Sequence, residues 1–491
     1  LGVPDGVMSA SVPLDEAALA LEERQHQLTT KEGWQERVLA GRRQAPAQLS
    51  HDEFAALAQP LKRRYDEARK VWNGMIDKYP ALIARCVCVS DVIETVNFAR
   101  DHGLPVSVRG GGHNVAGSAI ADSGIVIDLS GMANVDVDPL GRVARVEGGA
   151  LLSDMVRATQ PYGLVVPAGV VSETGIGGLT LGGGTGWVSR RYGLTIDNLI
   201  SAQVVTTEGR LIRASATEHP DLFWGLRGGG GGFGVVTSFE FQLSSLGPDV
   251  RIAAVFYHGN DAAAVLRGYR EYAASAPDDV TSLVSQGRIP EGHMFPAELY
   301  GQRFIFVMAC YAGPASEGSD LLQPLRELAT PLLDMSGVMP FSELQTFWDE
   351  EYPAGTLRYY WRSLYFDTLS DAAIERLIAL IDEAPSPLTT LDLGQMGGAI
   401  SRVRPHETAY PHRDAQYMAF VEANWEDPAD DEANIAWARR VVKEMQPFSN
   451  GGQAPNFPGL FEDRENLYGD NYRRIQTIRA RYDPANLFRT R

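Results

Sequence analysis

The chain has 491 residues, of which 44% are hydrophobic and 22% charged, and its formal net charge is −18 at pH 7. This length and composition are typical of a globular protein with two or more domains. Such an acidic surface repels phosphate backbones, so we expect no nucleic-acid partner. No apolar run approaches the roughly 20 residues that span a bilayer, so we also expect no membrane segment.

The three cysteines are too few for a disulfide framework, which fits a reducing compartment. The N-terminus lacks a basic region followed by an apolar core, so no signal peptide is predicted. The nine histidines show no zinc-binding spacing. We therefore expect a cytoplasmic protein without a metal site, either a monomer or a homodimer.

The predicted elements begin with a helical extension over residues 1–50, which is rich in Ala, Glu, Gln and Arg. From about residue 51, short helices and strands alternate. Ser90 is expected to cap a helix over 91–103, and a strand over 104–110 runs directly into a glycine loop. Further strands are predicted over 124–130, 142–149 and 233–243, a helix over 150–163, and a hairpin over 201–215.

After about residue 248 glycines become rarer and long strands dominate. Strands are predicted over 250–259, 280–289, 303–313, 358–366, 389–396 and 415–425, and helices over 261–276, 370–384 and near 468–488. Each strand has one apolar face, which indicates an antiparallel sheet covered by helices. The uncovered face is expected to line a pocket against the glycine-rich part of the chain.

Three glycine runs, at 110–112, 175–186 and 227–234, are the most unusual feature of the sequence. Glycine lets a backbone approach a ligand closely, and its uncovered N–H groups suit a phosphate. A Rossmann dinucleotide loop needs a helix after the glycines, whereas an alternating strand follows the run at 227–234. The runs therefore predict a long cofactor that is held by loops between strands.

Several long motifs carry a more specific signal. They are RGGGHNVAG (109–117), PAGVVSETGIGGLTLGGGTGWVSRRYGLTIDNL (167–199), LFWGLRGGGGGFGVVTSFEF (222–241) and the terminal YGDNYRRI and YDPANLF. Together they resemble the berberine bridge enzyme family, which are flavin-dependent oxidases of the vanillyl-alcohol oxidase superfamily. The resemblance runs with gaps from about residue 60 to the end. It is strongest to bacterial members that tailor polyketides, such as the enterocin-pathway Favorskii-type oxidase.

This resemblance implies an α+β fold with FAD as the cofactor. It places a PCMH-type FAD-binding domain of two subdomains over residues 51–247. A substrate domain, with an antiparallel sheet covered by helices, is expected over 248–445. A C-terminal segment over 446–491 is expected to return to the FAD domain.

The resemblance also implies a covalent bond from His113, after the first glycine run, to the 8α-methyl carbon of the flavin. Many members add a second bond from a cysteine. Aligned on Gly175, that position is Val171 here, so a single link is expected. The family's C-terminal Tyr-x-Asn element keeps Asn456 but has Ala454 in place of the tyrosine.

By the same resemblance, residues 109–114 hold the pyrophosphate, 174–178 run beside the flavin ring, with Ile176 near the path of oxygen, and Gly232 and Val236 lie near the adenine. The full set of expected FAD-binding residues is Arg109, Gly110, Gly111, Gly112, His113, Asn114, Gly117, Ser118, Ala168, Gly169, Val170, Thr174, Gly175, Ile176, Gly177, Gly178, Gly186, Trp187, Gly232, Val236 and Asn456.

Hydride transfer to flavin N5 needs a close donor carbon, and often a base that takes the substrate's O–H or N–H proton. Asp392 matches an acidic position of the polyketide-tailoring relatives, and an apolar pocket raises the pKa of a carboxyl. Gln395 is close in sequence, but strand alternation puts it on the opposite face. Tyr360, Arg362 and Tyr365 are further pocket candidates.

The main hypothesis is an oxidase of a small hydrophobic secondary metabolite, an alcohol or polyketide-like compound, with O₂ as acceptor and hydrogen peroxide as product. A flavin-dependent monooxygenase of a polyketide-like substrate is the alternative enzyme. A non-catalytic flavin-binding protein is the third hypothesis.

Overall fold

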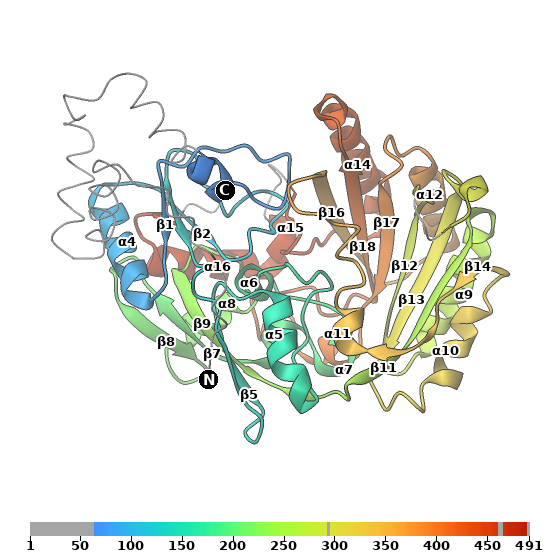
Figure 1. The fold of residues 1–491 in the computed structure, drawn as a ribbon, viewed down its shortest axis with the longest axis horizontal. Helices are drawn as coiled ribbons and strands as arrows, with labels where there is room; N and C mark the ends of the chain where they lie inside the picture. The colour runs from blue at the N-terminus through green and yellow to red at the C-terminus, as the bar shows by residue number, and fades with distance from the viewer. Residues whose placement is uncertain (1–62, 292–294, 460–464, 489–491) are drawn as a thin grey trace, which may run out of the picture. The chain divides into compact units, whose positions relative to one another are not determined.

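The computed structural model describes residues 63–291, 295–459 and 465–488, so the extension predicted over 1–50 lies outside the described residues. The chain divides into two units after residue 67, and nearly all of the described residues belong to the second, which begins at residue 68. Within the second unit, the glycine-rich half comprises residues 68–246 and the C-terminal residues 465–488. The large-sheet half comprises residues 249–445 (Figure 1).

A small parallel sheet opens the glycine-rich half. Its order is β1 (Leu82–Arg85), β3 (Ile125–Asp128) and β2 (Val106–Arg109), with β3 buried throughout. The helix α4 (Val89–Asp101) precedes β2, and the last residue of β2 leads into the first glycine run. The predicted cap of α4 is wrong. The Asp91 carboxylate accepts from the backbone N–H groups of Val87 and Cys88, so the helix begins before Ser90.

A second, antiparallel sheet has the order β4-β5-β9-β7-β8. Its strands are β4 (Val135–Asp138), β5 (Val143–Glu147), β7 (Leu199–Val205), β8 (Leu211–Ser215) and β9 (Val235–Gln242). The hairpin predicted over 201–215 is confirmed as β7 and β8, and Gly209 in its turn has a φ of 70°. Short elements complete this half, namely α5 (Leu152–Thr159), β6 (Leu164–Val165), α6 (Ile176–Leu181), α7 (Ser189–Tyr192), α8 (Pro220–Leu226) and β10 (Ser244–Ser245).

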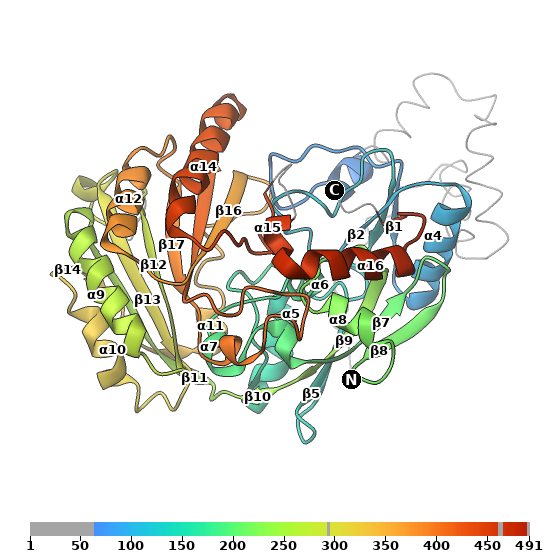
Figure 2. The same ribbon diagram turned by 180° about the vertical axis from the view of Figure 1, so that it is seen from behind.

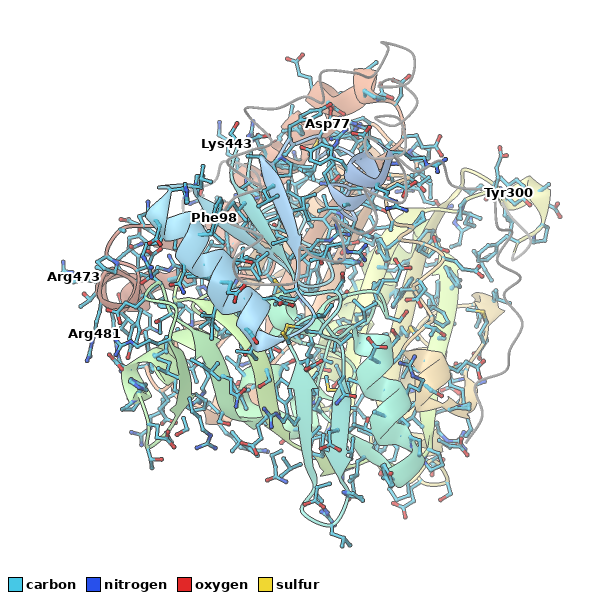
Figure 3. All side chains as sticks on the ribbon, turned by 60° about the vertical axis from the view of Figure 1, so that its left-hand side comes forward. Asp77, Phe98, Tyr300, Lys443, Arg473 and Arg481 are labelled. Atoms are coloured by element: carbon cyan, nitrogen blue, oxygen red, sulfur yellow. The ribbon has the colours of Figure 1, made fainter. Side chains whose placement is uncertain are left out.

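The C-terminal helices pack onto this half of the molecule. Figure 2 shows α15 (Glu465–Tyr468) and α16 (Tyr472–Tyr482) beside α8. Ile475 and Ile478 of α16 are buried in the same core as β7 and β9. Arg473 and Arg481 are exposed at the outer edge of the helix (Figure 3). One face of α16 therefore closes the core, and the opposite face meets solvent.

The large-sheet half is built on eight strands, seven of them in the order β14-β11-β13-β12-β17-β18-β16, with β15 also paired to β11. All of these pairs are antiparallel. The strands are β11 (Asp249–His258), β12 (Val280–Arg288), β13 (Arg303–Tyr311), β14 (Pro331–Asp334), β15 (Gly337–Pro340), β16 (Arg358–Phe366), β17 (Thr390–Gln395) and β18 (Tyr417–Trp425).

Helices cover one face of this sheet, as predicted (Figures 1 and 2). They are α9 (Ala262–Ser275), α10 (Ser319–Arg326), α12 (Asp371–Asp382) and α14 (Asp431–Met445), and the short helices α11 (Phe341–Leu344) and α13 (Ala399–Arg402) lie in connections. Ile374, Leu377 and Ile381 of α12 are buried at helical spacing. The expected α+β fold with an antiparallel sheet covered by helices is therefore confirmed.

Strand alternation divides the side chains of the large sheet between two environments. On β17, Leu391 and Leu393 lie in the core beneath the helices. Asp392 and Gly394 lie on the other face and line a cavity. The same division on β18 puts Val421 in the helical core and leaves Phe420 and Glu422 at the cavity.

Buried ionic and polar contacts join the two halves. The connection from β17 to β18 carries Arg413, which has no exposed side-chain surface and donates to both oxygens of Asp197 at 2.7 and 2.8 Å. Arg190 of α7 donates to the carbonyl oxygens of Val280 and Ala276 at 2.8 and 3.1 Å. These contacts hold the uncovered face of the large sheet against the glycine-rich loops.

Replacing Arg413 with Ala should leave the Asp197 carboxylate buried and without its cation, which costs about 3–5 kcal/mol of unfolding free energy. Denaturant unfolding at pH 7 measures this loss. Arg404, which contacts Glu407 on the surface, supplies the control, and Arg404→Ala should change the unfolding free energy by less than about 1 kcal/mol. Equal losses for the two variants would show that the buried pair does not hold the halves together.

Candidate active site

A cavity of about 450 Å³ lies between the glycine-rich loops and the uncovered face of the large sheet. This volume falls in the range typical of small-molecule sites. The glycine-rich half contributes mainly bare backbone to its wall. The large-sheet half contributes aromatic and acidic side chains. The cavity extends from Asp392 on β17 to Arg479 on α16.

Two glycine loops touch each other backbone to backbone in the cavity wall. A Cβ on Gly175 would lie 2.2 Å from the nitrogen of Gly111, and a Cβ on Gly111 would lie 2.5 Å from the nitrogen of Gly175. No side chain fits at either position. The third glycine run reaches the far end of the cavity, where Gly232 has a φ of 95°. Such a surface of uncovered N–H groups suits a phosphate-bearing cofactor.

His113 lies at the end of the first glycine loop and lines the cavity. Its ring stacks on Trp72, with ring centroids 4.1 Å apart, and Trp72 stacks in turn on Tyr359 at 3.8 Å. Its Nε2 atom is buried without a hydrogen-bond partner in the described parts of the chain. Burial lowers the pKa of His113 to about 4, so the imidazole is neutral at pH 7. A neutral ring held rigidly with a free nitrogen fits a site of flavin attachment.

Most of the expected FAD-binding residues come together at this cavity. Those that line it are Gly110, Gly111, Gly112, His113, Asn114, Ser118, Gly169, Val170, Thr174, Gly175, Gly177, Gly178, Gly186, Trp187, Gly232, Val236 and Asn456. Asn456 fastens the C-terminal segment to the second loop, since its amide donates to the Leu179 carbonyl at 3.0 Å and accepts from the Gly184 N–H at 3.2 Å. Ala454, at the tyrosine position, is buried in a neighbouring core.

Four of the expected FAD-binding residues do not line the cavity. Ile176 is fully buried in the core of the glycine-rich half, so its placement beside the oxygen path is corrected. Val170 and Val171 line the cavity near that position instead. Arg109 donates to the Ala68 carbonyl and therefore supports the loop from behind. The other two shape the loops, because a Cβ on Gly117 would meet Ile76 and the Ala168 carbonyl packs against Gly186.

The opposite wall of the cavity carries two carboxyl groups. Asp392 of β17 has a buried Oδ1 without a hydrogen-bond partner among the described residues. Burial raises the pKa of Asp392 to about 7, although the hydroxyls of Ser285 and Thr390 act in the opposite direction. On β18, burial and then the charge of Asp392 raise the pKa of Glu422 well above its ordinary value. The Tyr352 hydroxyl donates to Glu422 Oε2 at 2.6 Å.

Tyr352 belongs to a segment, residues 345–352, that joins the two walls. The Gln345 amide donates to the Gly169 carbonyl at 2.8 Å. Asp349 accepts hydrogen bonds from the N–H, at 2.8 Å, and from the hydroxyl of Ser172. The Trp72 indole donates to the Tyr352 carbonyl at 2.9 Å. Through these bonds the glycine-rich half positions Trp348 and Tyr352 at the cavity.

Of the other expected catalytic residues, Gln395 lines the cavity but its side-chain hydrogen bonds are made elsewhere, and Tyr360 does not line the cavity. The Gln395 side chain donates to the Ala273 carbonyl of α9 at 2.8 Å and accepts from Ser282 Oγ at 2.7 Å. It therefore lies on the opposite face from Asp392, as alternation predicts. Tyr360 is corrected for the same reason, because its hydroxyl accepts from Arg439 of α14 at 3.1 Å beneath the helices.

Arg362 and Tyr365 are also absent from the cavity wall. Arg362 is buried and donates to the Gln453 side chain at 3.3 Å. The Tyr365 hydroxyl is hydrogen-bonded to that of Tyr410. Trp361 is the residue of β16 that does line the cavity.

Sequence reasoning missed several residues of this wall, namely Trp348, Tyr352, Trp361 and Glu422, and it missed Trp72, which stacks on His113 without lining the cavity itself. Glu422 had a readable signal, because it is the single charged residue in the apolar run YMAFVEANW. Because side chains alternate along a strand, Glu422 lies on the same face as Phe420 and Met418. Trp72 and Tyr352 lie in irregular segments, whose approach to the cavity depends on long-range packing.

Two absences hold for the described residues. No group of three or more His, Cys, Asp or Glu side chains among them is placed to hold a metal ion. None of their helices combines the length and apolar character needed to cross a bilayer.

Replacing Gly175 with Ala should push the two glycine loops apart, at a cost of about 1–3 kcal/mol. If the whole cost falls on the cofactor site, at 1.4 kcal/mol per tenfold change FAD binding should weaken by about 5- to 140-fold. The ratio of visible to ultraviolet absorbance of the purified protein reports the flavin content per chain. Gly337 on β15 has open space around its Cβ position, so Gly337→Ala should keep the full content. Full flavin content in Gly175→Ala would contradict the role of the loop contact.

Comparisons with known proteins agree with this geometry. The family profile described as "FAD binding domain" matches residues 80–215, and that described as "Berberine and berberine like" matches residues 455–491. The uncharacterized FAD-linked oxidoreductase YgaK of Bacillus subtilis is 31% identical over 436 residues, which are 87% of this chain and 93% of that protein. The (R)-6-hydroxynicotine oxidase of Paenarthrobacter nicotinovorans is 29% identical over 452 residues, 87% of this chain and 93% of that protein.

A solved structure of a chitooligosaccharide oxidase superposes with a TM-score of 0.76 at 25% identity, covering 87% of this chain and 94% of that one. The similarity spans both halves of the molecule, so it includes the cavity between them. Together with the cavity wall of uncovered glycine backbone and the unpartnered Nε2 atom of His113, these matches identify the cofactor as FAD. The chain belongs to the berberine bridge enzyme-like family of FAD-linked oxidoreductases.

Proposed function

We propose that the chain binds FAD through a single covalent bond to His113 and acts as an oxidase of a small hydrophobic secondary metabolite, an alcohol or a polyketide-like compound. Electrons pass to O₂, and hydrogen peroxide is released. The domain boundaries at 51–247, 248–445 and 446–491 are part of the same proposal. The observation that carries it is the presence of His113 and Asp392 on opposite walls of one cavity.

Bound FAD would supply the redox chemistry, as acceptor of a hydride from the substrate and donor of electrons to oxygen. The residues of this chain supply the remaining requirements. The glycine loops hold the phosphates through backbone N–H groups. Asp392 takes the proton of the substrate hydroxyl at its unpartnered Oδ1, and a pKa of about 7 suits a base that works at neutral pH. Trp348, Trp361 and Phe420 form an apolar wall that excludes water and contacts the substrate.

The single link is supported by the residue at the cysteine position. Val171 lines the cavity and has no nucleophilic group. The cysteines of the chain lie elsewhere, because Cys86 and Cys88 lie just before α4 and Cys310 is buried in β13. The oxidase reading is supported by relatives named as oxidases of hydroxynicotine and of chitooligosaccharides. The aromatic wall suits a hydrophobic substrate.

Acid precipitation of the purified protein tests the covalent bond. The yellow colour should stay in the pellet, and peptide mapping by mass spectrometry should find flavin on the peptide that contains His113 and on no other. His113→Ala should release all colour into the supernatant. His102→Ala, at the end of α4 and outside the cavity, should behave as wild type. Colour on a second peptide, or in the wild-type supernatant, would refute the single link.

Photoreduction without oxygen, followed by admission of air, tests the acceptor without a known substrate. An oxidase should regain its colour within seconds and release one hydrogen peroxide per flavin. A return over many minutes would identify a dehydrogenase or a binding protein instead. A long-lived altered absorption spectrum would favour the monooxygenase.

A further inference from the structure

We propose that Glu422 is a positioning residue for the base: Asp392 and Glu422 form one buried carboxyl pair that retains a single proton, held on Glu422, while Asp392 takes the substrate proton. This inference rests on the proposed function, which makes Asp392 the base. It adds a second acidic residue with a distinct role and fixes which of the two is ionised.

Strand register brings the two carboxyl groups together. β17 and β18 are antiparallel, with Thr390 opposite Glu422 and Asp392 opposite Phe420. Asp392 and Glu422 are therefore diagonal neighbours on one face of the sheet, a separation that long side chains span. Both line the cavity.

Tyr352 distinguishes the two carboxyl groups. Its hydroxyl donates to Glu422 Oε2 at 2.6 Å, and its carbonyl is held by the Trp72 indole. Its ring packs edge-on against Trp361, the register partner of Glu422, at 5.3 Å. Glu422 is thus fixed in the wall. Asp392 Oδ1 has no such partner among the described residues and is the oxygen left for a substrate proton.

No cation in the cavity wall offsets a second negative charge. Of the described residues that line the cavity, only His113 and Arg479 are basic. Burial keeps His113 neutral by lowering its pKa to about 4, and Arg479 donates to the Gly229 carbonyl at the far end. Two carboxylates in such surroundings cannot both ionise near neutral pH.

The remaining groups around the pair are neutral or turned away. Strand β12 places Ser285 opposite Asp392 in the register. Strand β16 contributes Trp361 and, beside it, Tyr359, whose pKa is raised by burial. Burial also raises the pKa of Tyr352, so both phenols stay protonated. Glu351, next to Tyr352, is exposed and does not line the cavity.

These surroundings set the order of ionisation. Burial raises the pKa of Asp392 to about 7, and burial and then the charge of Asp392 hold the pKa of Glu422 well above its ordinary value, against the opposing effect of the Tyr352 hydrogen bond. The base form of Asp392 is therefore present above about pH 7 and is lost as the pH falls through that value. Over the same range Glu422 keeps its proton. The pair behaves as one acid–base unit with a net charge of −1 at mildly alkaline pH.

Infrared spectroscopy of the carboxylic acid C=O band, recorded on the full-length flavoprotein across the pH range, tests the assignment. Difference spectra between wild type and Glu422→Gln, Asp392→Asn and the double variant isolate the two groups. Wild type should show one acid band that disappears around pH 7 and a second that persists above it. Asp392→Asn should lose the first band and Glu422→Gln the second. The exposed Glu407→Gln should change neither.

Three results would overturn the proposal. Loss of the titrating band in Glu422→Gln would show that Asp392 holds the proton. The absence of any persistent acid band in wild type above pH 7 would show that both groups ionise. Persistence of both bands in both single variants would show that neither carboxyl behaves as described. The wild-type spectrum alone decides the second case, so the test survives a variant that fails to fold.

The infrared readout needs neither substrate nor a covalent flavin, so it separates this inference from the proposed function. If the pair shows one persistent proton but air does not reoxidise the reduced flavin, the oxidase proposal fails and the pair stands. Once a substrate is known, Glu422→Gln should retain the fall in kcat/KM below pH 7, whereas Asp392→Asn should abolish it.

Discussion

The contact between the two glycine loops is the constraint on which the site depends. Gly111 and Gly175 approach so closely that neither position has room for a Cβ. The first loop ends at His113, and the second continues into α6 and is fastened to the C-terminal segment by Asn456. The position of the His113 imidazole relative to the uncovered glycine backbone of the cavity wall follows from this contact. A single added carbon would disturb both at once.

The large sheet contributes chemistry by an equally simple rule. Alternation along β17 and β18 sends apolar side chains beneath the helices and leaves acidic and aromatic ones at the cavity. The face that no helix covers is therefore free to carry groups that would be costly in a core. Carboxyls placed there are buried by the opposing loops rather than by their own sheet, which raises the pKa of Asp392.

Periodicity and glycine patterns predicted the parts of the fold that depend on local sequence. The hairpin β7–β8, the helices α9 and α12 and the antiparallel sheet all follow from alternation or helical spacing. The helix α14 also had such a spacing, with Trp437, Ala438 and Val441 buried, but was not predicted. The cap of α4 was misplaced because the helix begins at Val89, where the Asp91 carboxylate accepts from the backbone N–H groups of Val87 and Cys88 just before the first turn.

The same distinction, between features set by local sequence and features set by long-range contacts, applies to the candidate site. Asp392 and the glycine loops lie in patterned sequence, and the structure brings them to one cavity. Ile176 is the first residue of α6 and its side chain is buried in the core, a direction that sequence spacing does not encode. Tyr352 and Trp72 depend on contacts between segments about 280 residues apart in the chain. Only the folded arrangement reveals such residues.

The segment over residues 345–352 has a consequence for how this enzyme can change over time. It belongs to no strand, and its hydrogen bonds to Gly169 and Ser172 and from Trp72 use only its ends and its middle, at Gln345, Asp349 and Tyr352. Trp348 occupies a position between these anchors and faces the cavity. Exchanging that side chain would reshape the substrate wall while the anchors, the sheet and the cofactor cradle stay intact. New substrates are thus accessible through very few substitutions, which suits a scaffold shared by relatives that oxidise molecules as different as hydroxynicotine and chitooligosaccharides.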